Sequence, residues 1–442
     1  MKSVKFIKAT MLIVTLLLTL SCDKEDVVPE VPVSNSMALG SFQATSFTVN
    51  LTGTFDGAEK TDLIKGKRGV MYCVKSDDAE SKFKEWLNGN DNPGCTIIDK
   101  ADFSGTTMKC QITGLTANTE YSYCLFLQRA NGNREISAMS TFKTQPFNPE
   151  MKSFDVKGVE CFVAFAEGKI IIDDKDGSYC ETGVLISEDM NCDINNSAIF
   201  KQKGVYSPDI SARMDGLKSD THYYCRMYVK YPVSDGKFDY VYGQTKIIKT
   251  KDLNMVAVDL HLPSGNLWAS YNVGAEKPEE FGNYYAWGDV EPKKDYNYSS
   301  YKWRTDSKYN TDTLSANLSR FKNLELVDDA ANYNWGGNWR MPRNSDMDEL
   351  WYNCNYDDNA EINGVKGYRF YNNFGEIFIP YAGFYRETAL NGKGYMFLFN
   401  LSDLYFCESP SSYYLWRWSI KDDHYVYYLG DGAPVRPVYP RE

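Results

Sequence analysis

A repeat with a period of 102 residues places the strongest constraint on how this chain folds. Gly114-Leu115 precedes Tyr121 in the first copy and Gly216-Leu217 precedes Tyr223 in the second, with a threonine two residues before each tyrosine. Glycine-containing pairs such as Asn131-Gly132 are typical of tight turns between antiparallel strands. The repeat therefore predicts two consecutive units with the same pattern of strands and turns.

These patterns predict two antiparallel β-sandwiches, over residues 38–146 and 147–251. The leucine, turn and threonine–tyrosine pattern resembles that of fibronectin type III modules, in which the tyrosine packs across a corner between two strands. The resemblance implies all-β domains of the immunoglobulin or fibronectin kind. Modules of this kind commonly act as spacers, so we expect them to hold another part of the chain away from a surface.

The N-terminus has the composition of an export signal. Lys2, Lys5 and Lys8 precede an apolar stretch over residues 9–20, which is too short to cross a bilayer of about 30 Å as a permanent helix. Residues 1–21 are therefore predicted to be a signal peptide. The alternative to a lipoprotein signal is an ordinary signal peptide with a cysteine at its end by chance.

Cys22 follows Ser21 at the end of the leader, an arrangement that resembles a bacterial lipobox. The resemblance implies that Cys22 becomes the lipid-bearing N-terminus of the mature chain. Residues 22–37, with an acidic start and two prolines, are expected to form a flexible tether. The acidic cluster resembles the export signal of Bacteroidetes surface lipoproteins, which implies a membrane partner through the lipid and a location on the cell outer membrane.

Charge and composition exclude several classes of function. The net charge of −11 argues against a protein that binds nucleic acid through its phosphates. The chain has three histidines and lacks the glycine-rich and histidine motifs of phosphate, zinc or hydrolase sites, so no catalytic residue, metal site or cofactor is predicted and the chain is not expected to be an enzyme. Asp328-Asp329 are expected to be solvated or to start a helix, with paired acids of glycoside cleavage as the alternative.

Ten cysteines remain after Cys22, and they divide along the chain into groups of four, four and two. Even numbers permit disulfide bonds in an oxidising compartment, although the sequence does not select a pairing. The alternative is that many of them are reduced, buried and act as small hydrophobic residues.

The composition changes in the C-terminal part, residues 252–442. The last 192 residues hold 22 of the 33 tyrosines and eight of the nine tryptophans. Recognisable runs of sequence recur here in order: Gly282-Asn283-Tyr284-Tyr285-Ala286-Trp287-Gly288, Asn334-Trp335-Gly336-Gly337-Asn338-Trp339-Arg340-Met341-Pro342 and Val435-Arg436-Pro437-Val438. Together they resemble the Fibrobacter succinogenes major paralogous domain, which implies an α+β fold of the C-type lectin-like class.

The same resemblance implies that Val256–Leu262 and Pro434–Val438 lie side by side and close the domain. The spacing of Met347, Leu350, Trp351 and Cys354 predicts a helix over Asp346–Cys354 with these four residues on one face. Asn344 or Ser345 is expected to be its N-cap.

The aromatic residues near the C-terminus are the candidate ligand-binding site. Two segments, residues 413–418 and 422–428, read as a hairpin in which one face fills the core and the other meets a ligand. The candidate residues are Tyr413, Trp416, Arg417, Trp418, Tyr425 and Tyr427, types that dominate binding hot spots. The alternative is that these aromatic residues build the core of the domain.

The sequence therefore predicts an envelope lipoprotein with a lectin-like C-terminal domain that binds a glycan or a protein, as an adhesin does. A structural or assembly subunit of the cell envelope or a pilus tip is the competing class. A third hypothesis is a display protein diversified by a retroelement, because residues 395–430 are rich in tyrosine, asparagine, serine and aspartate.

Overall fold

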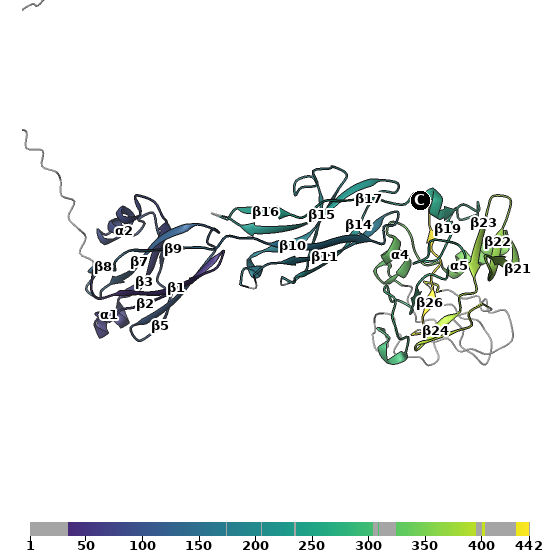
Figure 1. Ribbon diagram of the computed structural model, residues 1–442. Coiled ribbons are helices and arrows are strands. Elements are labelled where there is room, and N and C mark those ends of the chain that lie inside the picture. The colour runs from purple at the N-terminus through teal and green to yellow at the C-terminus, as the bar shows by residue number, and fades with distance from the viewer. Residues whose placement is uncertain are drawn as a thin grey trace, which may run out of the picture. The chain divides into compact units, whose positions relative to one another are not determined.

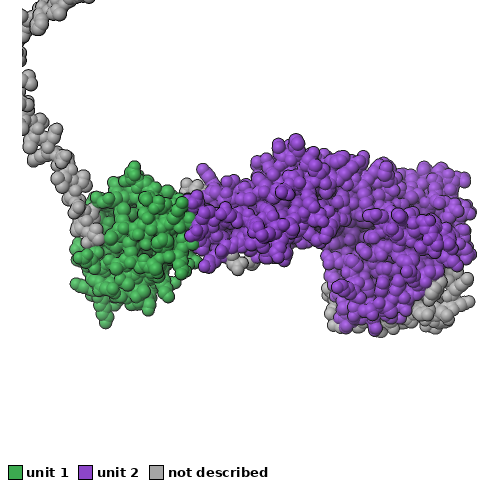
Figure 2. Space-filling model, viewed as in Figure 1, with its two compact units in different colours: residues 1–44, 49–113, 119–144 green, residues 45–48, 114–118, 145–442 purple. Residues whose placement is uncertain are grey.

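A computed structural model describes residues 34–173, 175–204, 206–233, 236–303, 308, 324–394, 400–402 and 430–441 (Figure 1). The chain divides into two compact units (Figure 2): the first contains residues 1–44, 49–113 and 119–144, and the second contains residues 45–48, 114–118 and 145–442. No helix in the described ranges has both the length and the apolar character needed to cross a membrane. The described part of the chain is rich in antiparallel β-sheet, as the sequence predicts.

The first unit contains two antiparallel sheets. One sheet has the strand order β1 (Ala38–Ala44), β2 (Thr48–Thr54), β6 (Thr107–Thr113) and β5 (Asp102–Ser104). The other has the order β4 (Thr96–Ile98), β3 (Lys67–Val74), β7 (Glu120–Gln128) and β8 (Arg134–Ile136), and β9 (Ser140–Lys143) also pairs with β7. Burial alternates strictly along β6, so one face of that strand is turned into the core.

Two helices accompany these sheets, α1 (Lys60–Lys65) and α2 (Ala79–Leu87). Phe83 and Trp86 of α2 are buried against Phe126 of β7, and the Trp86 and Phe126 ring centroids lie 5.1 Å apart. The helix therefore covers the outer face of the second sheet.

The second unit begins with another pair of antiparallel sheets. The first has the order β10 (Glu150–Lys157), β11 (Val163–Ile171) and β14 (Asp209–Asp215). The second has the order β13 (Ala198–Lys201), β12 (Glu181–Ser187), β15 (His222–Pro232) and β16 (Phe238–Tyr242), with β17 (Lys246–Lys249) also paired to β15. A short 3-10 helix spans Gly177–Tyr179.

The repeated tyrosine has a defined role in this second pair of sheets. The Tyr223 hydroxyl accepts a hydrogen bond of 2.9 Å from the backbone N–H of Lys218, five residues earlier. Tyr223 is buried in the core between the sheets together with Leu217. The conserved spacing between leucine and tyrosine in the two repeats therefore places both side chains in one core at the corner before β15.

The C-terminal segment combines short helices with small antiparallel sheets. Its helices are α3 (Leu253–Val256), α4 (Ala330–Trp335) and α5 (Asn344–Asn353), with 3-10 helices at Tyr298–Ser300 and Leu326–Asp328. Its sheets are β18 (Ala257–Val258), β19 (Leu267–Ala269) and β27 (Val438–Tyr439); β20 (Tyr284–Tyr285) and β26 (Ala433–Pro434); β21 (Asn355–Ile362), β22 (Val365–Tyr371) and β23 (Glu376–Pro380); and β24 (Phe384–Arg386) and β25 (Ala389–Asn391).

Helix α5 confirms the predicted amphipathic helix. Met347 and Leu350 are fully buried, and Trp351 and Cys354 are partly buried in the same core. The predicted N-cap is wrong, because Arg343 occupies that position and Asn344 is already inside the helix. The Asp346 carboxylate accepts the backbone N–H of Arg343 at 2.7 Å, so the acidic residue in the first turn fixes the helix start one residue earlier.

The expected contact between the first and last strands of the segment is also wrong in detail. β18 pairs with β19, and β19 pairs with β27, so Leu267–Ala269 lies between the two expected neighbours. The three strands still join the beginning and the end of the segment in one sheet. The tight turn at Gly265, with a φ of +73°, brings the chain back and inserts β19 into that position.

Most tryptophans that the structure describes in this segment form its core. Trp268, Trp287, Trp303, Trp335 and Trp339 are buried, and Trp351 is partly buried. For these residues the structure supports the core interpretation of the aromatic excess.

Arg436 is the most unusual residue of this core because its guanidinium group is completely buried. It donates hydrogen bonds to Asn272 Oδ1 at 2.8 Å, to the Ala269 carbonyl at 3.1 Å and to the Phe378 carbonyl at 2.9 Å. Burial lowers the pKa of Arg436 to about 9. One side chain thus joins β19, β23 and the C-terminal run.

Replacing Arg436 with methionine should destabilise the C-terminal segment by about 3 kcal/mol, because three buried oxygen acceptors lose their donor. Urea unfolding followed by tryptophan fluorescence measures the effect, since eight of the nine tryptophans lie in the last 192 residues. Arg441→Met is the matched control, because the Arg441 side chain is 52% exposed. A loss below about 1 kcal/mol for Arg436→Met would contradict this role.

Candidate functional site

The residues predicted from sequence to bind ligand or lipid lie outside the described part of the chain. They are Cys22, Tyr413, Trp416, Arg417, Trp418, Tyr425 and Tyr427. The expected hairpin over residues 413–428 lies outside it as well. The assignment of these residues therefore stays a prediction. The structure describes the residues that precede and follow residues 403–429 in the chain.

The residues that flank the candidate segment are held firmly in the core. Asn400 donates from Nδ2 to the Tyr285 carbonyl at 2.7 Å, and the Ser402 N–H donates to the Pro342 carbonyl at 2.8 Å. On the far side, the Asp431 carboxylate forms an ion pair of 2.6 Å with Arg386. Both ends of residues 403–429 are therefore fixed to the same folded segment.

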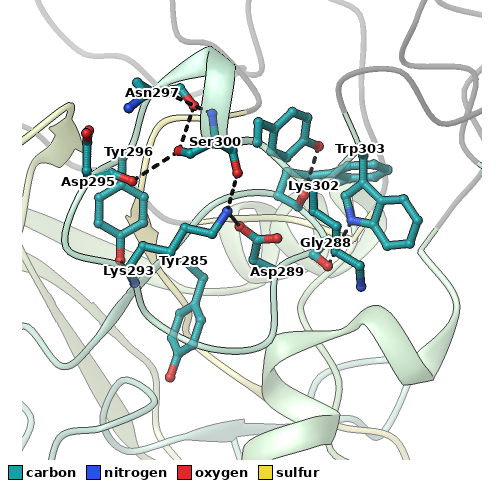
Figure 3. A network of polar contacts seen from close by, with 12 residues as sticks. Tyr285, Gly288, Asp289, Lys293, Asp295, Tyr296, Asn297, Ser300, Lys302 and Trp303 are labelled. Carbon is teal, nitrogen blue, oxygen red and sulfur yellow. Dashed lines mark hydrogen bonds and ion pairs between the residues drawn. The ribbon is translucent and has the colours of Figure 1, made fainter.

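A network of charged residues lies beside these flanking residues. We call Asp289, Lys293, Lys302, Lys308 and Asp328 the charge network. Lys293 Nζ lies 2.5 Å from Asp289 Oδ2 and donates to the Ser300 carbonyl at 3.1 Å (Figure 3). The Tyr296 hydroxyl accepts the Lys293 backbone N–H at 2.8 Å and donates to the Tyr284 carbonyl at 2.5 Å. The loop over residues 293–300 is thereby tied to β20.

Gly288 allows this loop to lie close to Trp303. Its φ is +76°, and a Cβ atom there would lie 2.5 Å from Trp303 Nε1, which donates to the Gly288 carbonyl at 3.0 Å. The Tyr301 hydroxyl makes a parallel bond of 2.9 Å to the Trp287 carbonyl. The glycine in the run Trp287-Gly288 is therefore required by a close approach of two loops.

Asp328 forms the second half of the charge network. Its carboxylate lies 3.1 Å from Lys302 Nζ and 2.6 Å from Lys308 Nζ, while its own side chain is only 6% exposed. Lys302 Nζ lies 4.1 Å from the centroid of the Trp303 ring, and the Lys302 side chain is half exposed. The network thus reaches from a buried carboxylate to an ammonium group at the surface.

Burial raises the pKa of Asp289, and the neighbouring ammonium of Lys293 opposes that effect. Both carboxylates of the network are engaged by lysines, which is an ion-pair arrangement and not a pair of carboxyl groups facing a scissile bond. The half-exposed ammonium of Lys302 over an aromatic ring can donate hydrogen bonds to hydroxyl or carboxylate groups of a ligand. In the described ranges, no three or more His, Cys, Asp or Glu side chains are grouped as a metal site requires.

Asp329 confirms the prediction that this acidic pair starts a helix. It is the N-cap of α4, and its Oδ1 accepts the backbone N–H groups of Ala331 and Asn332 at 2.9 and 3.0 Å. It also accepts the Met341 N–H, at 2.8 Å through Oδ2. Both acids are buried, so the other part of the expectation, that the pair is solvated, is wrong.

Every cysteine in the described part of the chain is a free thiol. Cys73, Cys95 and Cys124 gather in one apolar cluster beside Trp86, and burial raises the pKa of Cys95 to about 11. These residues behave as the small buried hydrophobic side chains of the second sequence interpretation. Cys407 lies outside the described residues.

The charge network was missed by sequence reasoning. Its members are Asp289 and Lys293, then Lys302 and Lys308, then Asp328 at the end of a short 3-10 helix, and neither helical nor strand periodicity in the sequence marks a shared face at these positions. The sequence did offer one signal, the glycine at position 288 directly after Trp287. Such a glycine indicates that another part of the chain approaches the backbone closely, but it does not identify that part as Trp303.

Comparison with known proteins gives weak likenesses. The chain is similar to the solved sensor domain of the anti-sigma factor RsgI4 in Pseudobacteroides cellulosolvens, with 20% identity, 25% of this chain and 98% of that chain covered, and a TM-score of 0.19. A solution structure of the same sensor domain gives 19% identity, 24% and 76% coverage and a TM-score of 0.18. Scores at this level carry no argument about fold or function. No family model and no curated protein matches the chain.

Asp329 should make stability depend on pH between about 4 and 6. Burial raises its pKa from 3.8 to about 6, so the folded state binds a proton that the unfolded state has already released in this window. Its contribution to the free energy of unfolding should therefore fall by about 2 kcal/mol as the pH rises from about 4 to about 6, and by about 3 kcal/mol over the whole titration.

The carboxyl carbon resonance of Asp329 should titrate with a midpoint near 6. The matched variant Asp329→Asn should lose this pH dependence, so its stability should improve relative to the wild-type chain as the pH rises. A midpoint below about 4 would show that the three backbone donors outweigh burial.

Proposed function

We propose that this chain is a lipid-anchored cell-envelope protein that displays a ligand-binding C-terminal domain. Cys22 would carry the lipid, residues 22–37 would act as a tether, and the units at 38–146 and 147–251 would be fibronectin type III-like spacers. Residues 252–442 would form the lectin-like domain. The paired antiparallel sheets and the Tyr223–Lys218 corner support the spacer assignment.

The observation that carries the binding proposal is the anchoring of residues 403–429 at both ends. Ser402 is bonded to Pro342, and Asp431 is paired with Arg386, so the described residues on either side of 403–429 belong to the same folded segment. Eight of its 27 residues are tyrosine or tryptophan. Tyrosine and tryptophan give large contact areas with hydrogen-bonding ends, so a segment of this composition suits recognition of a ligand.

The ligand proposed is a glycan or a protein. Aromatic rings stack on sugar rings and also form protein hot spots, and the charge network adds the half-exposed ammonium of Lys302 in the same C-terminal segment. The net charge of −11 disfavours a polyanionic ligand such as nucleic acid.

A binding screen tests the proposal with residues 23–442 on arrays of glycans and host-matrix proteins. For a ligand found in this way, Trp416→Ala and Tyr413→Ala should each weaken binding about tenfold or more with an unchanged melting temperature. Tyr352→Ala is the matched control, because Tyr352 is 70% exposed on α5 and should leave binding unchanged. A chain that binds nothing on the arrays but co-purifies with envelope proteins would instead be an assembly subunit.

The lipid anchor has its own test in cells. Cys22→Ala should abolish labelling with a palmitate analogue and move the chain from the membrane to the soluble fraction, because one thiol carries the attachment. Cys73→Ala is the matched control and should retain the label. Processing of the intact precursor that resists globomycin, an inhibitor of lipoprotein signal peptidase, would contradict the anchor.

A further inference from the structure

Within the second unit, the hydrophobic core of the C-terminal segment includes a side chain from the sandwich that precedes it. Cys161 lies between β10 and β11, yet it is fully buried in the core formed by Val256, Trp335 and other residues of the C-terminal segment. By contrast, the core between the sheets of the sandwich consists of the sandwich's own residues, from Ala164 to Val229. The core of the sandwich is therefore complete without the C-terminal segment, whereas the core of the C-terminal segment includes a residue of the sandwich.

Phe162 fits against two glycines of the C-terminal segment. A Cβ atom on Gly337 would lie 2.6 Å from Phe162 Cδ2, and a Cβ atom on Gly336 would lie 3.0 Å from the Phe162 backbone. The Phe162 ring also stacks on Tyr439, with 5.8 Å between the ring centroids. Because neither Gly336 nor Gly337 has a side chain, the pair leaves a space for Phe162, which we call the seat. Any larger residue at either position would occupy that space.

Arg213 of β14 binds the C-terminal end of α4. Its Nε donates to the Tyr333 carbonyl at 2.8 Å and one terminal nitrogen donates to the Asn332 carbonyl at 3.2 Å. The guanidinium carbon lies 5.2 Å from the centroid of the Tyr333 ring. The Asn332 carbonyl also accepts the Gly336 N–H at 2.9 Å, so Arg213 adds a second donor there and supplies a donor to Tyr333 in the last turn, where carbonyl groups lack a partner within the helix.

A charged residue of the sandwich also contacts the Tyr271 hydroxyl of the C-terminal segment. Lys251 Nζ lies 2.9 Å from a carboxylate oxygen of Glu160 and 3.3 Å from the Tyr271 hydroxyl. The Glu160 side chain is only 15% exposed, and burial raises its pKa. The ion pair itself lies within the sandwich, and the hydrogen bond from Lys251 to Tyr271 links it to the C-terminal segment.

We propose that residues 147–251 and the C-terminal segment form one rigid body, and that the C-terminal segment needs the sandwich to complete its core. The second sandwich is then a specific partner of the C-terminal segment and not an interchangeable spacer. This inference goes beyond the proposed ligand binding and holds whatever the ligand is. It means that the C-terminal segment is oriented by the chain on which it is mounted.

A double-mutant cycle in residues 23–442 tests the seat. Gly337→Ala should raise the unfolding equilibrium constant of the C-terminal segment about tenfold or more in the wild-type background, through the collision with Phe162 and the positive φ of +54°. In the Phe162→Ala background the collision disappears, so the same change should cost severalfold less. Equal effects in the two backgrounds would mean that Phe162 does not fill the seat.

Pulsed hydrogen exchange along a urea gradient tests the single body. In the wild-type chain, peptides from residues 163–229 and from residues 330–350 should lose protection at the same urea concentration. Phe162→Ala should shift only the second set to lower urea, and Phe162→Leu should shift it less. Phe238→Ala is the matched control, because Phe238 is half exposed on β16. Separate transitions in the wild-type chain would overturn the proposal.

Discussion

The buried guanidinium of Arg436 is the interaction on which the C-terminal segment depends. Its removal from water is costly, and in the described structure its hydrogen-bond partners are neutral oxygens rather than a carboxylate. Such a group is retained only when its donors are satisfied with good geometry, and here they reach Asn272, Ala269 and Phe378. Strands that would each be too short to persist alone are thus held in register by one side chain.

The same region joins the start and the end of the segment. The N–H groups of Ala269 and Val273 donate to the carbonyls of Pro437 and Val435 at 2.9 Å each. Arg340 and Val438 exchange a further pair of backbone hydrogen bonds. These bonds tie residues 269–273 and Arg340 to residues 435–438, which follow Asp431 in the chain.

Sequence predicted those features that depend on local periodicity. Helix α5 follows from the spacing of Met347, Leu350 and Trp351, and the repeated sheets follow from turn spacing and from the tyrosine corner. It failed where a contact depends on residues distant in the chain. The predicted N-cap was wrong because the Asp346 carboxylate accepts the Arg343 N–H. The charge network was missed because its residues show no helical or strand periodicity in the sequence.

The run from Trp335 to Pro342 shows why this part of the sequence is so dense in distinctive residues. Trp335 and Trp339 fill one core, and Gly336-Gly337 seats Phe162. Further along, Arg340 forms a buried ion pair of 2.6 Å with Asp346, and the Pro342 carbonyl holds Ser402.

Residues of the run thus contact four neighbours: the core, Phe162 of the preceding sandwich, helix α5 and Ser402. A substitution in this run would disturb several of these contacts together. The core of the C-terminal segment, its contact with Phe162 and the hydrogen bond to Ser402 therefore all depend on the eight residues from Trp335 to Pro342.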